Sequence, residues 1–127
     1  MGTEQSTKVF VVDDNIVARS MLSRMSGSIA GISVVGDMGT GHGAVLMLDE
    51  INPDIVLLEA TVKSNLNIVD VVKQMKVLKP DVRIILCADH MGIDYVMPAI
   101  DAGASDFVLK PIKSEVLERI IKRVITL

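Results

Sequence analysis

The sequence predicts an α/β fold in which a doubly wound parallel sheet of five strands carries helices on both faces. Apolar runs of strand length alternate along the chain with segments that repeat apolar residues at helical spacing. The central run, residues 53–59, is apolar almost throughout and ends on Glu59, which is typical of a strand covered on both faces. Because 127 residues is the usual size of one domain, we expect a single domain.

Five segments have the composition of buried strands. Each is short, and each is rich in Val, Ile, Leu or Phe. The expected strands are residues 8–14, 32–36, 53–59, 83–88 and 107–111. The polar residues 1–7 are expected to form a flexible N-terminal tail, which leaves 8–127 as the folded domain.

Helices are expected between these strands and after the last one. Asp14 or Asn15 can cap the first helix, and Thr40 can cap the second. Pro98 falls inside the fourth helix, where we expect it to kink or loosen the helix. The expected helical segments are 18–27, 44–51, 68–78, 93–102 and 116–125.

Composition excludes several classes of function. No apolar run approaches the roughly 18 residues of a membrane span, and no secretion signal is evident, so we expect a cytoplasmic protein with no membrane contact. A net charge of −3 and an aromatic content of 2% argue against nucleic-acid binding. Cys87 has no second cysteine to pair with, so we expect an inert buried thiol. His42 and His90 are expected to be exposed loop residues without a role.

Carboxylates end two of the expected strands. Asp13 and Asp14 close the first strand, and Glu59 closes the third. Since the carboxyl ends of parallel strands meet at one edge of the sheet, these acids should lie near one another. Such a group favours a cation or a lysine at this edge over a role as ordinary loop acids. We expect Lys110, at the end of the fifth strand, to be buried beside them.

Three motifs together resemble the receiver domain of bacterial two-component response regulators, especially the single-domain chemotaxis regulators. They are Val11-Val12-Asp13-Asp14, the strand that ends at Glu59, and the run from Gly103 to Pro111. The resemblance covers residues 8–127. It implies a flavodoxin-like fold with strand order 2-1-3-4-5 and a signalling module that is not itself an enzyme.

The resemblance also implies roles for single residues. Asp13 and Asp14 match the acids that hold Mg²⁺ in the family, and Lys110 matches the lysine that pairs with the phosphoryl group. Phe107 matches the switch aromatic of strand five, and the bond between Lys110 and Pro111 matches a position that is usually cis. The implied partners are a histidine kinase and signalling proteins that meet the surface of helix four, strand five and helix five.

The sequence departs from the family at the reactive position. Glu59 stands where the family has its phosphorylated aspartate, and Cys87 stands where it has a Thr or Ser; Lys63 and Asn67 also replace the usual Pro and Gly. The extra methylene moves the carboxylate by about 1 Å, which can slow a reaction about a hundredfold. A thiol is also a weak hydrogen-bond donor. We therefore expect a phosphorylation-independent pseudo-receiver that acts through protein contacts.

In this hypothesis Glu59 becomes a fixed anion that pairs with Lys110. The carboxylate would imitate a phosphorylated aspartate only in part, because it has less charge and fewer acceptor oxygens. Asp13, Asp14 and Glu59 would still attract Mg²⁺, but weakly, since Lys110 shares the same field. The expected output surface would then rest in one dominant state.

A rival hypothesis comes from Gly39-Thr40-Gly41-His42-Gly43-Ala44, which matches the dinucleotide-binding pattern G-x-G-x-x-G/A. Glu59 follows about twenty residues later, where a ribose-binding acid would be expected. The match predicts a nucleotide- or dinucleotide-binding module instead of a signalling domain. It leaves Asp13, Asp14 and Lys110 unexplained, and it follows the second strand instead of the first.

Overall fold

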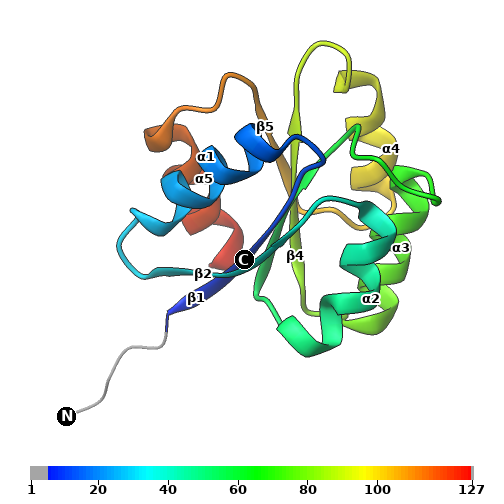
Figure 1. Cartoon of the computed structure of the whole chain (residues 1–127), viewed down its shortest axis with the longest axis horizontal. Coiled ribbons are helices and arrows are strands. Elements are labelled where there is room, and N and C mark those ends of the chain that lie inside the picture. Colours follow the sequence, from blue (N-terminus) through cyan, green and yellow to red (C-terminus); the bar gives the residue numbers. More distant parts are fainter. Residues whose placement is uncertain (1–5, 127) are drawn as a thin grey trace.

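The computed structural model describes residues 6–126 and contains one sheet of five parallel strands (Figure 1). The strand order is β2-β1-β3-β4-β5, so β3 is the central strand and has β1 and β4 as its neighbours. The strands are β1 (Thr7–Val12), β2 (Ile32–Met38), β3 (Ile55–Glu59), β4 (Arg83–Ala88) and β5 (Asp106–Leu109). The predicted flavodoxin-like fold and its strand order are confirmed.

Helices follow each strand in the described part of the chain. They are α1 (Ile16–Gly27), α2 (Gly41–Ile51), α3 (Ile68–Leu78), the short 3₁₀-helix η1 (Ile93–Tyr95), α4 (Val96–Asp101) and α5 (Ser114–Ile125). Asn15, Thr40 and Asn67 cap the first three, because each side chain accepts a hydrogen bond from the backbone N–H three residues later. The predicted caps at Asn15 and Thr40 are confirmed.

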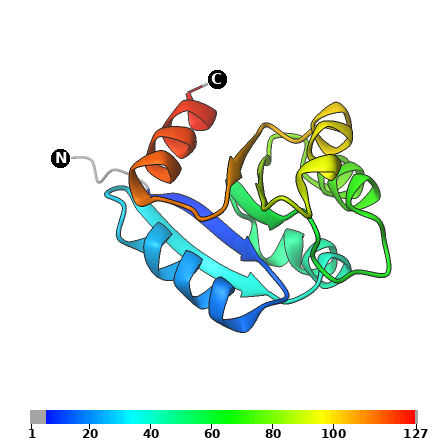
Figure 2. The same ribbon diagram turned by 90° about the horizontal axis from the view of Figure 1, so that it is seen from above.

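The helices form two layers around the sheet. α1 and α5 cover one face, and α2, α3 and α4 cover the other (Figure 2). Since successive strand residues point to opposite faces, Leu57 packs beneath α1 and α5 whereas Leu58 packs beneath α2, α3 and α4. Every residue of β3 is buried. The unbroken apolar run of this strand is therefore explained by two separate cores.

Pro98 does not kink a long helix. The segment expected to be one helix, 93–102, is divided into η1 and the shorter α4. Pro98 is the third residue of α4, and the first N–H groups of a helix have no partner within the helix. The expected loosening near Pro98 is thus present, although the segment forms a 3₁₀ turn and a short α-helix instead of one continuous helix.

Other boundaries differ by a few residues from the expected ones. β1 begins at Thr7, so the folded part starts one residue earlier than expected, and residues 1–5 of the expected tail lie outside the described residues. β5 ends at Leu109, which leaves Lys110 and Pro111 in the loop that follows. α2 begins directly after its Thr40 cap, so His42 is a partly buried helix residue and not the exposed loop residue that we expected.

Candidate functional site

Asp13, Glu59 and Lys110 meet at the carboxyl edge of the sheet. Asp13 follows β1, Glu59 is the last residue of β3, and Lys110 follows β5. β1 and β3 are neighbours, but β4 lies between β3 and β5. The backbone N–H of Lys110 donates to the carbonyl of Ala88 at the end of β4, at 2.8 Å. From this anchored position the lysine side chain reaches back across the end of β4.

The Lys110 ammonium forms an ion pair with Glu59. Its Nζ lies 2.7 Å from Oε2 of Glu59 and 3.4 Å from Oδ2 of Asp13. The side chains of Glu59 and Asp13 are 6% and 3% exposed, whereas that of Lys110 is 26% exposed. The carboxylates are thus enclosed, and solvent reaches the pair from the side of the lysine. This arrangement is the lysine site that the acids at the sheet edge predicted.

The second oxygen of each carboxylate has its own donor. The hydroxyl of Thr61 donates to Oε1 of Glu59 at 3.1 Å, and the backbone N–H of Asn15 donates to Oδ1 of Asp13 at 2.9 Å. Each carboxylate is therefore held at both oxygens, which fixes its orientation. The sequence analysis did not identify Thr61; the available signal was a hydroxyl residue two positions after Glu59.

Burial and charge act in opposite directions on this pair. Burial raises the pKa of Glu59 above its ordinary value, and the attraction and hydrogen bond of Lys110 only partly oppose that rise. For Lys110, burial would lower the pKa, but the hydrogen bond and charge of Glu59, together with Asp13, raise it. The raised pKa of Lys110 favours its protonated form, whereas the raised pKa of Glu59 means that this buried carboxyl group takes up a proton more readily than an exposed one.

Cys87 lies beside Glu59, because the two residues are paired positions of β4 and β3. The thiol is fully buried, and this burial, followed by the charge of Glu59, raises its pKa to about 12. Cys87 belongs to the core beneath α1 and α5, whereas Phe107 packs against the core beneath α2, α3 and α4. The two residues at the switch positions of the resemblance thus lie against opposite faces of the sheet.

Asp13, Asp14 and Glu59 are not arranged around a common point for a cation. Asp14 is exposed, while Asp13 and Glu59 are buried. Over residues 6–126, no group of three His, Cys, Asp or Glu side chains is placed to hold a metal ion. The Lys110 ammonium lies within reach of both buried carboxylates, so a divalent ion would have to displace it. Mg²⁺ could therefore reach these carboxylates only after the Lys110 ammonium has moved away from them.

The glycine-rich segment 39–44 does not support the nucleotide-binding hypothesis. The N–H of Gly41 donates to the carbonyl of Lys63 at 2.9 Å, and the N–H of Gly43 donates to the Thr40 hydroxyl at 3.1 Å. These backbone donors, which would have to hold phosphate in that hypothesis, are already engaged. A Cβ at Gly41 would lie 3.0 Å from the Ser64 side chain, so this glycine permits close packing.

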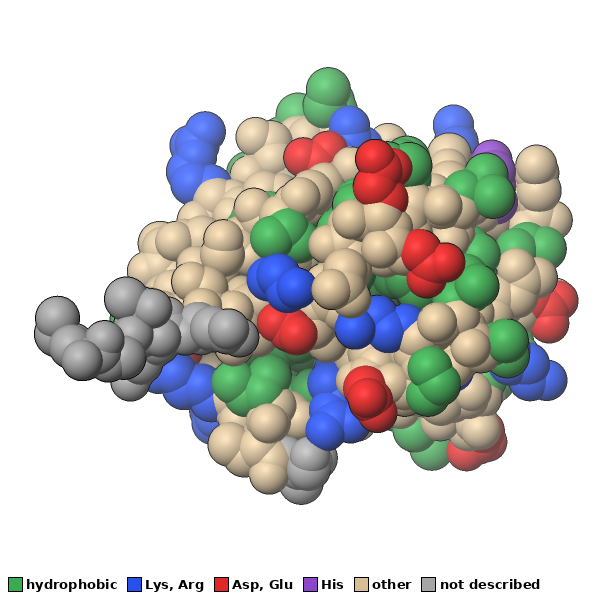
Figure 3. All heavy atoms as spheres, turned by 90° about the horizontal axis from the view of Figure 1, so that it is seen from below, with side chains coloured by type: hydrophobic (Ala, Val, Ile, Leu, Met, Phe, Trp, Pro, Cys, Tyr) green, Lys and Arg blue, Asp and Glu red, His purple; other side chains and the backbone are tan. Residues whose placement is uncertain are grey.

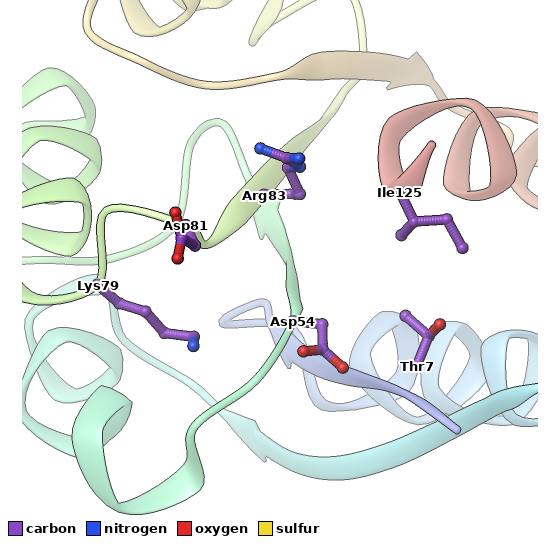
Figure 4. Close-up of a pocket in the computed structure, with 6 residues that line it drawn as sticks. All are labelled: Thr7, Asp54, Lys79, Asp81, Arg83 and Ile125. Carbon is purple, nitrogen blue, oxygen red and sulfur yellow. The ribbon is translucent and has the colours of Figure 1, made fainter. Parts of the chain in front are cut away.

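The opposite edge of the sheet carries a pocket of mixed charge. Figure 4 shows that its charged side chains come from the starts of β3 and β4 and from the preceding turn. The pocket is lined by Thr7, Asp54, Lys79, Asp81, Arg83 and Ile125. The carboxylate of Asp54 is engaged by the N–H of Lys8 at 2.8 Å. Acidic and basic side chains are interspersed on the face in Figure 3, so no single sign of charge selects a ligand there.

An apolar groove of about 230 Å³ lies beside the ion pair, between α1 and the segment that follows β5. It is lined by Asp13, Ala18, Met21, Leu22, Met25, Lys110, Pro111 and Ile112. The peptide bond between Lys110 and Pro111 is cis, the isomer that the resemblance implies. Across the described residues, no helix is both long enough and apolar enough to cross a membrane.

A family model described as the response regulator receiver domain matches residues 9–122 of this chain. The chain is also similar to the chemotaxis protein CheY of Thermotoga maritima, with 35% identity over 116 residues. That match covers 91% of this chain and 95% of the relative. The sequence comparison thus agrees with the arrangement of strands and acids.

Longer relatives contain a similar region as one part of the protein. The chain is 31% identical to the protein-glutamate methylesterase/protein-glutamine glutaminase of Treponema pallidum, and the match covers 91% of this chain and 29% of the relative. It is equally identical to the DNA-binding transcriptional activator DevR/DosR of Mycobacterium tuberculosis, of which it spans 54%. The chain therefore spans about a third to a half of these relatives.

Solved structures with the same fold include a two-component response regulator of the LuxR family from Aurantimonas, with a TM-score of 0.86 and 23% identity. The match covers 96% of this chain and 86% of that chain. A signal receiver domain of a modulated diguanylate cyclase from Desulfovibrio desulfuricans gives a TM-score of 0.84 at 22% identity, with 96% and 95% covered. At these identities the likeness shows the fold alone.

Proposed function

The chain belongs to the response regulator receiver domain family of two-component signalling, and from this membership we propose that it is a pseudo-receiver that works without phosphorylation. The observation that carries the proposal is the ion pair between Glu59 and Lys110 at the position of the family's phosphoacceptor. In this proposal the pair replaces the phosphoryl group as a permanent part of the fold. The expected cytoplasmic location is part of the same proposal.

The geometry of Glu59 disfavours its phosphorylation. The side chain is 6% exposed, and both of its oxygens have partners, Lys110 on one and Thr61 on the other. A carboxylate that attacks a phosphoryl group must first present a free oxygen to it. Cys87, fully buried beside Glu59, supplies a weak donor where a hydroxyl would bind the phosphoryl oxygens.

The crevice formed by Asp13, Glu59 and Lys110 would keep one arrangement, because the anion that pairs with Lys110 is a side chain of the protein and not an added phosphoryl group. Lys110 already has a carboxylate at 2.7 Å, which is a short charge-assisted contact. A carboxylate has one negative charge and two oxygens, whereas a phosphorylated carboxylate has more of both. We infer that the crevice holds a single state that resembles the phosphorylated one only in part.

Receiver domains generally bind Mg²⁺ at their acidic site, and we propose that this chain binds it weakly. Asp13, Asp14 and Glu59 supply the oxygen atoms that Mg²⁺ prefers. The positive charge of Lys110, 3.4 Å from Asp13 and 2.7 Å from Glu59, opposes the approach of a second cation. Any bound ion would be held by these carboxylates after the lysine has moved.

Receiver domains interact with histidine kinases and other signalling proteins, and we propose that this one meets its partner through α4, β5 and α5. Apolar side chains are exposed on and next to these elements: Tyr95 before α4, Met97 on α4 and Leu109 on β5 are each at least half exposed. An exposed apolar cluster is a common feature of protein-binding surfaces. The domain would act through this contact and not as an enzyme.

Treatment with acetyl phosphate and Mg²⁺, followed by intact-protein mass spectrometry, tests this function. We expect no phosphorylated species for the parent protein. The double variant Glu59→Asp/Cys87→Thr restores both family residues and should gain one phosphoryl group, so it is the positive control. Stoichiometric phosphorylation of Glu59 in the parent would overturn the proposal.

A further inference from the structure

His42 joins the start of α2 to the loop between β3 and α3, residues 60–67. Its Nδ1 accepts a hydrogen bond from the backbone N–H of Asn65 at 3.1 Å. A backbone N–H can only donate, so Nδ1 must be unprotonated for this bond to exist. Histidine is the one type of side chain whose charge ordinarily changes between about pH 5 and 8. The contact therefore depends on the protonation state of His42.

Among the described residues, this is one of two hydrogen bonds that join the loop to the first residues of α2. The other joins the N–H of Gly41 to the carbonyl of Lys63 at 2.9 Å. A Cβ at Gly41 would lie 3.0 Å from Ser64, so the loop approaches the helix as closely as a glycine allows. Protonation of Nδ1 would place an N–H donor against the N–H of Asn65, so the hydrogen bond between His42 and Asn65 would be lost.

We propose that His42 is a pH-sensitive latch for the Asn65 part of the loop 60–67: the neutral imidazole holds the Asn65 backbone against α2, and the protonated imidazole releases it, while the bond between Gly41 and Lys63 remains. This inference goes beyond the proposed function, because the latch holds whether or not Glu59 replaces a phosphoryl group.

Among the described residues, no charged side chain forms a hydrogen bond or an ion pair with the His42 ring. α2 packs on α3, β2 and β1, and hydrogen bonds join it to the loop. Several charges on these elements have partners of their own: Asp70 accepts from Asn67, Asp37 pairs with Arg19, and Lys76 donates to backbone carbonyls. The charged groups on α2 and on all these elements are Lys8, Asp37, Asp49, Glu50, Lys63, Asp70, Lys73 and Lys76.

The test follows backbone amides by NMR between pH 8 and pH 5, using the full chain and three variants. His42→Asn keeps an acceptor near the place of Nδ1 but cannot titrate. His42→Ala removes the acceptor. His90→Asn changes the other histidine, which is exposed, and is the matched control.

In the parent and in His90→Asn, we expect the Asn65 amide resonance to move as His42 titrates. Its hydrogen-exchange protection, corrected for the intrinsic effect of pH, should fall about threefold to tenfold, as for the loss of one hydrogen bond. His42→Asn should keep the protected state at both pH values, and His42→Ala should show the released state at both.

Two results would overturn the latch. One is an Asn65 amide in the parent that does not respond while the His42 ring titrates. The other is a pH response of Asn65 that persists in His42→Asn. The spectra also show whether each variant is folded, so a misfolded variant would not be mistaken for a released loop.

Discussion

Lys110 and Glu59 join the ends of two strands that are not neighbours, β5 and β3, through a contact of 2.7 Å between Nζ and Oε2. This ion pair spans the end of β4, where Cys87 is paired with Glu59 in the sheet. The Lys110 side chain thereby links the loop after β5 to the central strand β3, and substitution of either residue would alter this link.

Replacement of Glu59 by Gln should make stability less dependent on pH. The pKa of Glu59 is raised in the folded protein, chiefly by burial, so its contribution to stability is complete below the unfolded pKa, near 4.5, and is lost as pH rises through the folded pKa. Gln carries no charge at any pH. We therefore expect Glu59→Gln to gain stability relative to the parent as pH rises from about 4.5 through the folded pKa of Glu59, measured by urea unfolding. Glu50→Gln, an exposed change of the same kind, should show no such trend.

Removal of the lysine alone should be destabilising. In Lys110→Met the buried Glu59 carboxyl group loses its cation, and loss of one partner of a buried pair costs about 2 kcal/mol or more. Urea unfolding should show that the double variant Glu59→Gln/Lys110→Met recovers most of this loss. If the double variant is as unstable as Lys110→Met, the cost comes from packing and not from the unpaired carboxylate.

Thr61 should tune the ionisation of Glu59. Its hydrogen bond to Oε1 lowers the pKa of that carboxyl, so Thr61→Val should raise the pKa further, whereas Thr61→Ser should keep it. Titration of the Glu59 side-chain carboxyl carbon by NMR measures both variants. Equal pKa values in Thr61→Val and the parent would show that the hydroxyl does not hold the carboxylate in solution.

Cys87 should resist thiol reagents in the folded protein. The thiolate is the reactive form, and the pKa of about 12, raised chiefly by burial, leaves roughly one thiol in ten thousand ionised at pH 8. Labelling with iodoacetamide should be slow in buffer and rapid in concentrated urea, which is the internal control. Complete labelling in buffer at a rate faster than unfolding would contradict the buried position.

Mg²⁺ should compete with Lys110. We expect the parent to bind Mg²⁺ no more tightly than about 0.1 mM by calorimetry, in the range of weak carboxylate sites. Lys110→Ala should bind it more tightly, because the positive charge between Asp13 and Glu59 is removed. Lys113→Ala, at an exposed neighbouring position, should behave as the parent does. Submicromolar affinity of the parent would mean that Glu59 is a metal ligand and not the partner of Lys110.

The main features of the fold could be predicted because they depend on the order of strands and on polarity along the chain. Alternation of apolar runs with helical patterns predicted the five strands, and the family resemblance predicted their order. The side chain of Asn15 was expected to cap α1, and it does. The loosening expected near Pro98 is present, but the exact division into η1 and α4 could not be predicted, because the position of a proline relative to the first turn depends on where the helix begins.

The site was predictable only where strand ends determine it. Asp13 and Glu59 meet because β1 and β3 are parallel neighbours, and Lys110 joins them because β5 ends at the same edge. Thr61 and His42 could not be assigned, because their partners depend on the path of the loop 60–67. Periodicity contains no information about such a path.

Asp13 and Lys110 are separated by 97 positions in the sequence, although their side chains are in contact. Contacts between such distant positions form only after most of the intervening chain is ordered, because loop closure must come first. The crevice should therefore be absent from partly folded forms and from chains that end before β5. A partner that recognises Lys110 in contact with Asp13 and Glu59 would therefore bind the fully folded domain and not its partly folded forms.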